Sequence, residues 1–267
     1  MSLCGFARLN YSYDRQTPLY LQNYINPLIE SNYEELRELW GIDLEYPVEI
    51  TIERKRQLGA SGEASFDGGT YYLFMTPVTE TIPSLLRHEM MHLFTFQWLY
   101  SNNIESAPLW FLEGLAVWYE KHSTKNIEKL NPVSMMDEID VINRKEYPAG
   151  DAFARYYSFL ADFFIYLDSK VGLEEHFNQI LNNIKETGDF KAALTPGKEF
   201  KTVYSNWKRN KIIFSIFSFI TLQLSWALPA LVVIFMGIYI LIRRRNIKDI
   251  NIKDLERIYG KGYWKKD

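Results

Sequence analysis

Cysteine, histidine and, along one stretch, charge are all scarce in this sequence. The one cysteine, Cys4, rules out an intrachain disulfide framework. Residues 212–242 contain no charged side chain, whereas residues 243–267 contain nine Lys or Arg and four Asp or Glu. Since the whole chain has a net charge of −3, the first 211 residues carry −8. Nucleic-acid-binding domains cluster basic residues on their folded part, so an acidic body with a basic tail predicts no nucleic-acid partner.

The uncharged stretch is also strongly apolar and reads IIFSIFSFITLQLSWALPALVVIFMGIYILI. A transmembrane helix needs about 20 mostly apolar residues, and a core helix rarely runs so long without a charge. Basic residues flank the stretch on both sides, as suits lipid headgroups: Lys208, Arg209 and Lys211 precede it, and Arg243, Arg244 and Arg245 follow it. The sequence therefore predicts a domain at 1–210, a single transmembrane helix at 212–242 in contact with lipid, and a basic tail at 243–267.

The first 210 residues predict an α+β fold. Phe6–Tyr13 alternates polar and apolar residues as a strand does, and Thr17–Trp40 has the periodicity of a helix that ends at Gly41. Val48–Glu53 and Thr70–Met75 are β-rich, with a turn at Asp67-Gly68-Gly69. Beyond residue 80 the chain predicts helices at 84–100, 107–122, 150–170, 172–185 and 198–210. The expected fold is a small N-terminal β-sheet with helices, followed by a mostly helical half.

Two of the four histidines, His88 and His92, lie in an H-E-x-x-H pattern. On a helix, residues i and i+4 share one face, so both imidazoles can reach one metal ion. Glu89 projects beside that face, where it can take a proton from a metal-bound water. The alternative is a pair of surface or core histidines without a metal.

A catalytic zinc site needs a third protein ligand and one open position. A metzincin would have Gly at 95 and His at 98, but this sequence has Thr95 and Trp98, which excludes that class. The next candidate ligand is Glu113 in Trp110-Phe-Leu-Glu113-Gly114-Leu-Ala116. Its distance of 21 residues from His92 leaves room for a helix, a turn and an antiparallel return.

The two motifs together resemble those of the gluzincin zinc metallopeptidases, in particular peptidase MA-like domains related to thermolysin and the zinc aminopeptidases. The second motif of that family typically reads W-[LF]-x-E-G-x-A, and a weaker similarity extends through the segment 157–167. The resemblance implies a zincin-like fold, Zn²⁺ bound by His88, His92 and Glu113, and Glu89 as general base. It further implies that Tyr157 donates a hydrogen bond to the oxyanion, with Tyr156 as the rival.

The sequence departs from the family at two places. Many gluzincins have an acidic residue four positions after the third ligand, where this chain has Val117, so Glu120 and Asp151 are the candidates to support a zinc histidine. The G-x-M-E-N strand of the aminopeptidases is missing before His88, which favours an endopeptidase. In this family the strand before the active-site helix usually pairs with an extended substrate, and Thr70–Met75 is the candidate for that edge.

The predicted function is therefore that of a membrane-anchored zinc metallopeptidase acting on peptides or proteins. One alternative is a membrane-tethered module that binds peptides in a zincin groove without turnover. Another is a structural membrane protein with a chance motif. Oligomeric state stays open.

The orientation in the membrane follows from the flanking charges. Residues 243–262 contain seven Lys or Arg, against five in residues 192–211, which favours a cytoplasmic tail and an extracytoplasmic catalytic domain. Residues 1–16 contain no apolar segment of the kind found in signal peptides, so this orientation predicts a signal segment encoded ahead of Met1. The alternative is a complete chain with its catalytic domain in the cytoplasm.

Overall fold

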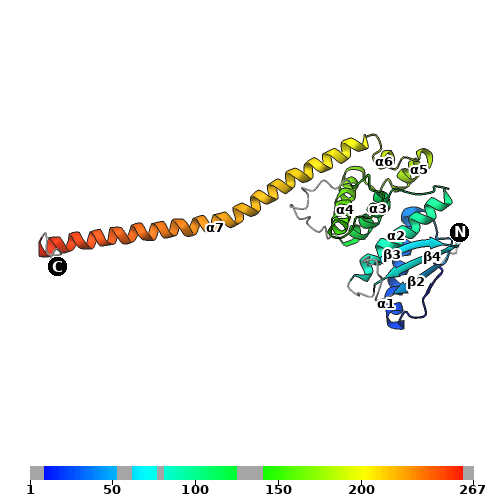
Figure 1. Ribbon diagram of the computed structural model, residues 1–267, viewed down its shortest axis with the longest axis horizontal. Coiled ribbons are helices and arrows are strands. Elements are labelled where there is room, and N and C mark those ends of the chain that lie inside the picture. The colour runs from blue at the N-terminus through cyan, green and yellow to red at the C-terminus, as the bar shows by residue number, and fades with distance from the viewer. Residues whose placement is uncertain (1–8, 53–61, 77–80, 125–140, 261–267) are drawn as a thin grey trace, which may run out of the picture. The chain divides into compact units, whose positions relative to one another are not determined.

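The computed structural model describes residues 9–52, 62–76, 81–124 and 141–260. For some residues in these ranges, among them most of 214–230, it describes the backbone but not the side chain. By its internal contacts the chain divides into two compact units, Met1–Asn210 and Lys211–Asp267. The first unit combines a four-stranded sheet with helices, so the predicted α+β class is confirmed (Figure 1).

The sheet is formed by β1 (Tyr11–Tyr13), β2 (Val48–Ile52), β3 (Gly62–Asp67) and β4 (Thr70–Met75) in the order β1-β2-β4-β3. Strands β1, β2 and β4 are parallel, and β3 is antiparallel to β4, with Phe66 opposite Tyr71. Gly68 and Gly69, both with positive φ, make the tight turn that joins β3 to β4. Of the predicted strand Phe6–Tyr13, residues 6–8 lie outside the described residues, and β1 covers its last three residues.

This strand order corrects the prediction that Thr70–Met75 is a free edge. Strand β4 pairs with β2 on one side and with β3 on the other, so its backbone groups are engaged by both neighbours. Among the described strands, β3 and β1 lie at the two edges, and the hairpin at Asp67–Gly69 places the segment before the turn on the outside of the sheet. The sequence marks the turn but not which of its two strands pairs with β2.

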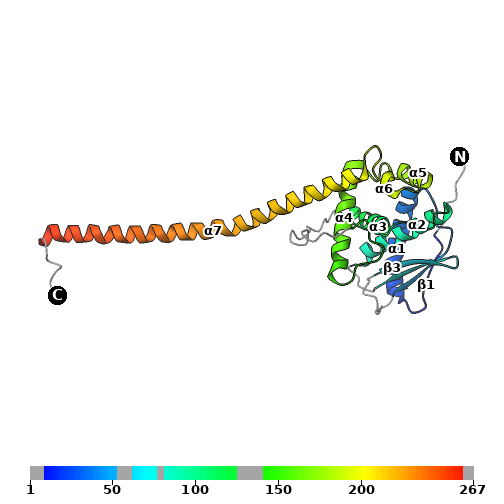
Figure 2. The same ribbon diagram turned by 45° about the horizontal axis from the view of Figure 1, so that its top comes forward.

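Two long helices, α1 (Leu19–Trp40) and α2 (Ile82–Ser101), pack together and against the sheet (Figures 1 and 2). Their contact is aromatic: Trp40 lies 6.1 Å from Trp98 between ring centroids, and Tyr33 lies 5.7 Å from Phe94. Alternate residues of the central strands, such as Ile50 and Leu73, are buried in the same core. The core therefore lies directly behind the helix that carries the H-E-x-x-H pattern.

Arg87 is the residue just before His88 on α2, and its side chain contacts two further helices. Its guanidinium donates to both carboxylate oxygens of Glu35, at 2.9 and 2.7 Å, and to Asn32 of α1 at 3.0 Å. It also lies 4.1 Å from the ring centroid of Tyr119 in α3 (Leu109–Thr124). A planar, multiply bonded guanidinium fixes geometry better than a single ion pair does. The position of α2 relative to α1 and α3 is thus set beside the candidate site.

The remaining helices are α4 (Asp151–Val171), α5 (Phe177–Thr187), α6 (Phe190–Ala193) and α7 (Phe200–Tyr259). Helix α4 packs against α3, and the start of α7 is held to α4 by a buried hydrogen bond of 2.7 Å from Trp207 to Asp162. Gly114 explains the close approach of α3 to α4, because a Cβ at that position would overlap the ring of Phe164. Small residues at a helix crossing allow such contact.

Helix α7 is longer than the two separate helices expected at 198–210 and 212–242. Within the described part of the chain, none of the helices combines the length and the apolar character that crossing a membrane requires. The side chains of residues 214–228 fall outside the described residues, and so does much of the predicted span.

Candidate metal centre

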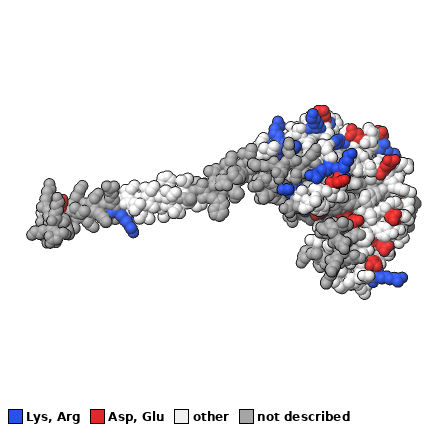
Figure 3. Space-filling model, in the orientation of Figure 1, with Lys and Arg blue, Asp and Glu red and all other residues white. Residues whose placement is uncertain are grey.

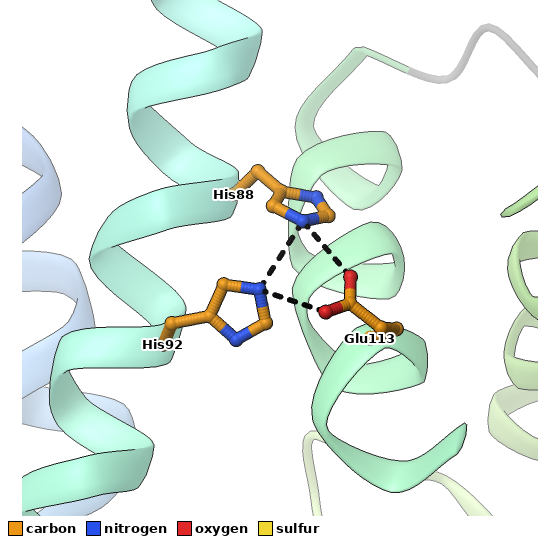
Figure 4. Close-up of side chains that lie close together, drawn as sticks. All are labelled: His88, His92 and Glu113. Atoms are coloured by element: carbon orange, nitrogen blue, oxygen red, sulfur yellow. Dashed lines mark hydrogen bonds and ion pairs between the residues drawn. The ribbon is translucent and has the colours of Figure 1, made fainter. Parts of the chain in front are cut away.

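His88 and His92 lie one turn apart on α2, and Glu113 faces them from α3 (Figure 4). The Nε2 atoms of the two histidines are 3.3 Å apart, and they lie 3.3 and 3.6 Å from the two carboxylate oxygens of Glu113. One potential ligand atom from each residue falls within 4.8 Å of the others. All three residues are buried, with 2–8% of their surface exposed, which excludes the reading as surface histidines.

The charges in this group fit a site built for a cation. Burial alone would lower the pKa of His88, but hydrogen bonds with Glu113 and Glu120 raise that pKa to about 10. Burial alone would raise the pKa of Glu113, but the charge of His92 and the hydrogen bond from His88 hold it well below its usual range. Two imidazoles and one charged carboxylate together form a donor set that Zn²⁺ binds in proteins. The three residues therefore fit a zinc ion, which would compete with the proton on His88.

Glu120 contacts the ring nitrogen of His88 that does not face Glu113. Its Oε2 lies 3.3 Å from Nδ1 of His88, the ring nitrogen that points away from Glu113. Glu120 follows Glu113 by seven residues, which is two helical turns, so both carboxylates lie on one face of α3. Of the two candidates for this supporting role, Glu120 is thus in contact with a site histidine, and the side chain of Asp151 lies outside the described residues.

Glu89 lies between the site and strand β3. It is 4% exposed, and burial raises the pKa of its carboxyl, an effect that the neighbouring histidine charges oppose. The first residue of β3, Gly62, approaches it so closely that a Cβ there would lie 2.5 Å from Oε1 of Glu89 and 2.6 Å from a methyl group of Leu85. Gly62 therefore leaves room for Glu89, a role that the sequence did not reveal.

For the hydrolytic function proposed below, we expect Gly62→Ala to lower the rate of hydrolysis by at least tenfold while metal content stays at the wild-type level. The added methyl group must displace Glu89 or Leu85, and a shift of about 1 Å in a catalytic group can cost a hundredfold in rate. Steady-state kinetics and metal analysis of the purified protein measure both quantities. Gly237→Ala is the matched control, because a Cβ at Gly237 meets no atom within 4 Å. An unchanged turnover number in Gly62→Ala would show that Glu89 does not depend on this contact.

Two tyrosine hydroxyls reach Glu113. Tyr147, in the segment before α4, donates to Oε1 of Glu113 at 2.5 Å, although 55% of its surface is exposed. Burial, followed by the charge of Glu113 and a hydrogen bond with it, raises the pKa of Tyr157, so this phenol stays protonated. The ring of Tyr157 lies 5.9 Å from that of His88 between centroids.

The rival Tyr156 does not share this arrangement. Its side chain is completely buried, and its hydroxyl has no hydrogen-bond partner within the described ranges. Of the two adjacent tyrosines, the structure thus brings Tyr157 to the site. Tyr147 was not predicted, because no pattern in the segment before α4 distinguishes it from the other tyrosines among the 18 in the chain.

Comparison with known proteins adds no relative: no family model, no curated protein and no solved structure matches the chain. The assignment of the site therefore depends on its own geometry. That geometry is a buried His-His-Glu group compatible with a zincin metallopeptidase.

Proposed function

We propose that this protein is a zinc-dependent peptidase of the gluzincin type. The observation that carries the proposal is the buried convergence of His88, His92 and Glu113, with Glu89 beside them on α2. Burying two imidazoles and a charged carboxylate is costly, and a metal ion bound by all three would offset that cost.

The residues have separate tasks in peptide hydrolysis. Zinc held by His88, His92 and Glu113 would supply Lewis acidity to the scissile carbonyl and to the attacking water. The carboxylate of Glu89 accepts a proton from that water and later returns it to the leaving amine. The hydroxyl of Tyr157 donates a hydrogen bond to the oxyanion that develops on the carbonyl oxygen. Glu120 keeps the ring of His88 oriented through Nδ1.

Strand β3 provides the place for an extended substrate. It is an edge strand, and its first residue contacts Glu89. A peptide that pairs with the side of β3 not occupied by any described strand would lie along the face where Glu89 and the metal ligands meet. The missing G-x-M-E-N strand favours internal bonds over the removal of N-terminal residues, so we propose an endopeptidase.

The direct test is metal analysis of the purified full chain combined with cleavage of a peptide library. About one zinc per chain together with cleavage supports the proposal. Bound zinc with no cleavage of any peptide favours the alternative of a peptide-binding module. A protein without zinc after growth and dialysis in zinc-containing buffer refutes the metal site.

Tyr157→Phe and Tyr147→Phe each remove only a hydroxyl group. Their effects should differ, because the two hydroxyls have different roles in the proposed mechanism. We expect Tyr157→Phe to lower the turnover number by about a hundredfold at unchanged zinc affinity, since an oxyanion donor contributes that much. Tyr147→Phe should weaken zinc binding by about tenfold, because its phenol donates to the ligand Glu113. Kinetics and a chelator competition distinguish the two variants. An unchanged turnover number in Tyr157→Phe would move the oxyanion role to another residue.

We also propose that the second unit anchors the protein in a membrane. Between Leu231 and Ile242 the large apolar side chains of α7 are each 46–69% exposed, no charged residue interrupts them, and Arg243 and Arg244 follow (Figure 3). A large exposed apolar surface of this kind marks a site of contact with a partner or a membrane. The basic residues that follow it favour lipid, because they suit the headgroup region. The proposed orientation places the catalytic unit outside and the tail in the cytoplasm.

Protease protection of spheroplasts with a tag after Asp267 tests this orientation. Digestion of the catalytic unit with survival of the tag supports it. A protected catalytic unit with a digested tag reverses it, and recovery of the chain in the soluble fraction refutes the anchor.

A further inference from the structure

A groove of about 900 Å³ lies between strand β3 and the C-terminal half of α2. Its walls are mostly apolar and include Phe66 of β3, Phe96, Leu99 and Tyr100 of α2, and Ile104 of the segment that follows. None of the tasks described above uses these side chains. Figures 1 and 2 show β3 alongside α2.

The groove lies next to the candidate metal centre. The ring of Phe96 stacks on that of His92, with 6.0 Å between centroids and 15° between ring planes. On the opposite wall, Ala64 and Phe66 follow Gly62 at alternate positions of β3, so they share the strand face that contacts Glu89. A chain that passes the metal ligands along β3 therefore arrives in this groove.

The far end of the groove is held in place by local structure. Phe66 packs against Tyr100 at 5.8 Å and against Tyr71 at 4.8 Å between ring centroids. After α2, Asn103 has a φ of 54°, and the amide of Ile104 donates to the carbonyl of Leu99 at 2.9 Å. This turn folds Ile104 back over the end of the helix. The apolar walls therefore exist before any ligand binds, which lowers the entropy cost of binding.

We propose that this groove is a specificity pocket for a bulky apolar side chain of the substrate, three or four residues before the bond that is cleaved. From His92 to Tyr100 the helix advances about 12 Å, which an extended peptide covers in three or four residues. Strand β3 runs from Glu89 toward Tyr100, so a peptide antiparallel to it enters at the groove and has its N-terminal part there. The proposal depends on the proposed function for the position of the cleaved bond, but not for binding of the side chain.

Binding and cleavage of one set of peptides test the pocket. Fluorescein-labelled ten-residue peptides carry Phe at a single position in an otherwise constant background, with Ala in its place as the reference. Anisotropy titrations use zinc-loaded full-length Glu89→Gln protein, and the wild type locates the cleaved bond. We expect Phe at the third or fourth position before that bond to tighten binding by at least about tenfold, as burial of a large apolar side chain does.

Ile104→Glu places a charge in the pocket and should abolish this preference, while peptides with Ala at the same position bind as before. Leu19→Glu is the matched control, because Leu19 is 69% exposed on α1 and does not line the groove. Circular dichroism melting of both variants checks the fold, and if Ile104→Glu unfolds, Ile104→Ala, which shortens the apolar wall without adding a charge, should weaken the preference.

Cleavage without any preference at these positions, or a preference that persists in Ile104→Glu, overturns the pocket and leaves the peptidase proposal intact. Conversely, a preference in binding that depends on Ile104, in a protein that cleaves nothing, supports the pocket and refutes the peptidase proposal.

Discussion

Glu89→Gln should lose nearly all peptide hydrolysis and keep its zinc. The amide has the shape of the carboxylate but cannot accept a proton from the attacking water, and general-base catalysis contributes about a hundredfold or more. Glu89 is not one of the three residues of the candidate ligand group, so we expect the variant to keep all three ligands. Turnover numbers and zinc content of the same preparation measure the two effects together.

Glu38→Gln is the control for the change of charge, because Glu38 lies on the exposed side of α1. It should hydrolyse peptides at the wild-type rate. If Glu89→Gln retains more than about a tenth of the wild-type turnover, Glu89 is not the general base. Loss of zinc in the same variant would instead indicate that Glu89 shapes the metal centre itself.

The part of the site that the sequence predicted is the part that depends on helical spacing. His88 and His92 meet on one face of α2 because four residues make about one turn. Glu113 could be anticipated because its motif begins a second helix within reach of the first. Since these relations are local, or need only one antiparallel return, no knowledge of the tertiary fold was required.

The residues that the sequence did not reveal are those whose contacts depend on tertiary packing. Gly62 matters because β3 lies against α2, and nothing in the local pattern shows that the strand before the hairpin turn becomes the edge. Tyr147 is 34 residues from Glu113 and reaches it only through the packing of α3 with the segment before α4. The groove next to Phe96 likewise combines residues from three segments.

The fold, like the site, has features that follow from local sequence and features that depend on tertiary packing. The α+β class and the strand Thr70–Met75 follow from alternation and turn signals, which act over a few residues. The order β1-β2-β4-β3 does not follow, because strand pairing is decided by which buried faces meet the helices. Helix α7 runs through Pro229, where local propensity predicts a break.

Glu113→Ala should abolish zinc binding and hydrolysis together. It removes one of three candidate ligands, and the loss of zinc affinity should exceed the 10–100-fold typical of residues that only support a ligand. Glu120→Ala provides that comparison within the same helix, because Glu120 contacts His88 through Nδ1 and contributes no atom to the ligand group. We therefore expect the affinity for zinc to fall in the order wild type, Glu120→Ala, Glu113→Ala.

A chelator competition at fixed pH measures these affinities, and the visible spectrum of the cobalt-substituted protein reports the ligand set directly. Glu113→Asp separates position from charge: the shorter side chain keeps the carboxylate but withdraws it from the two Nε2 atoms, which now lie 3.3 and 3.6 Å away. Its zinc affinity should fall between those of Glu120→Ala and Glu113→Ala. Zinc binding by folded Glu113→Ala as tight as that of the wild type would remove Glu113 from the ligand set and, with it, the gluzincin assignment.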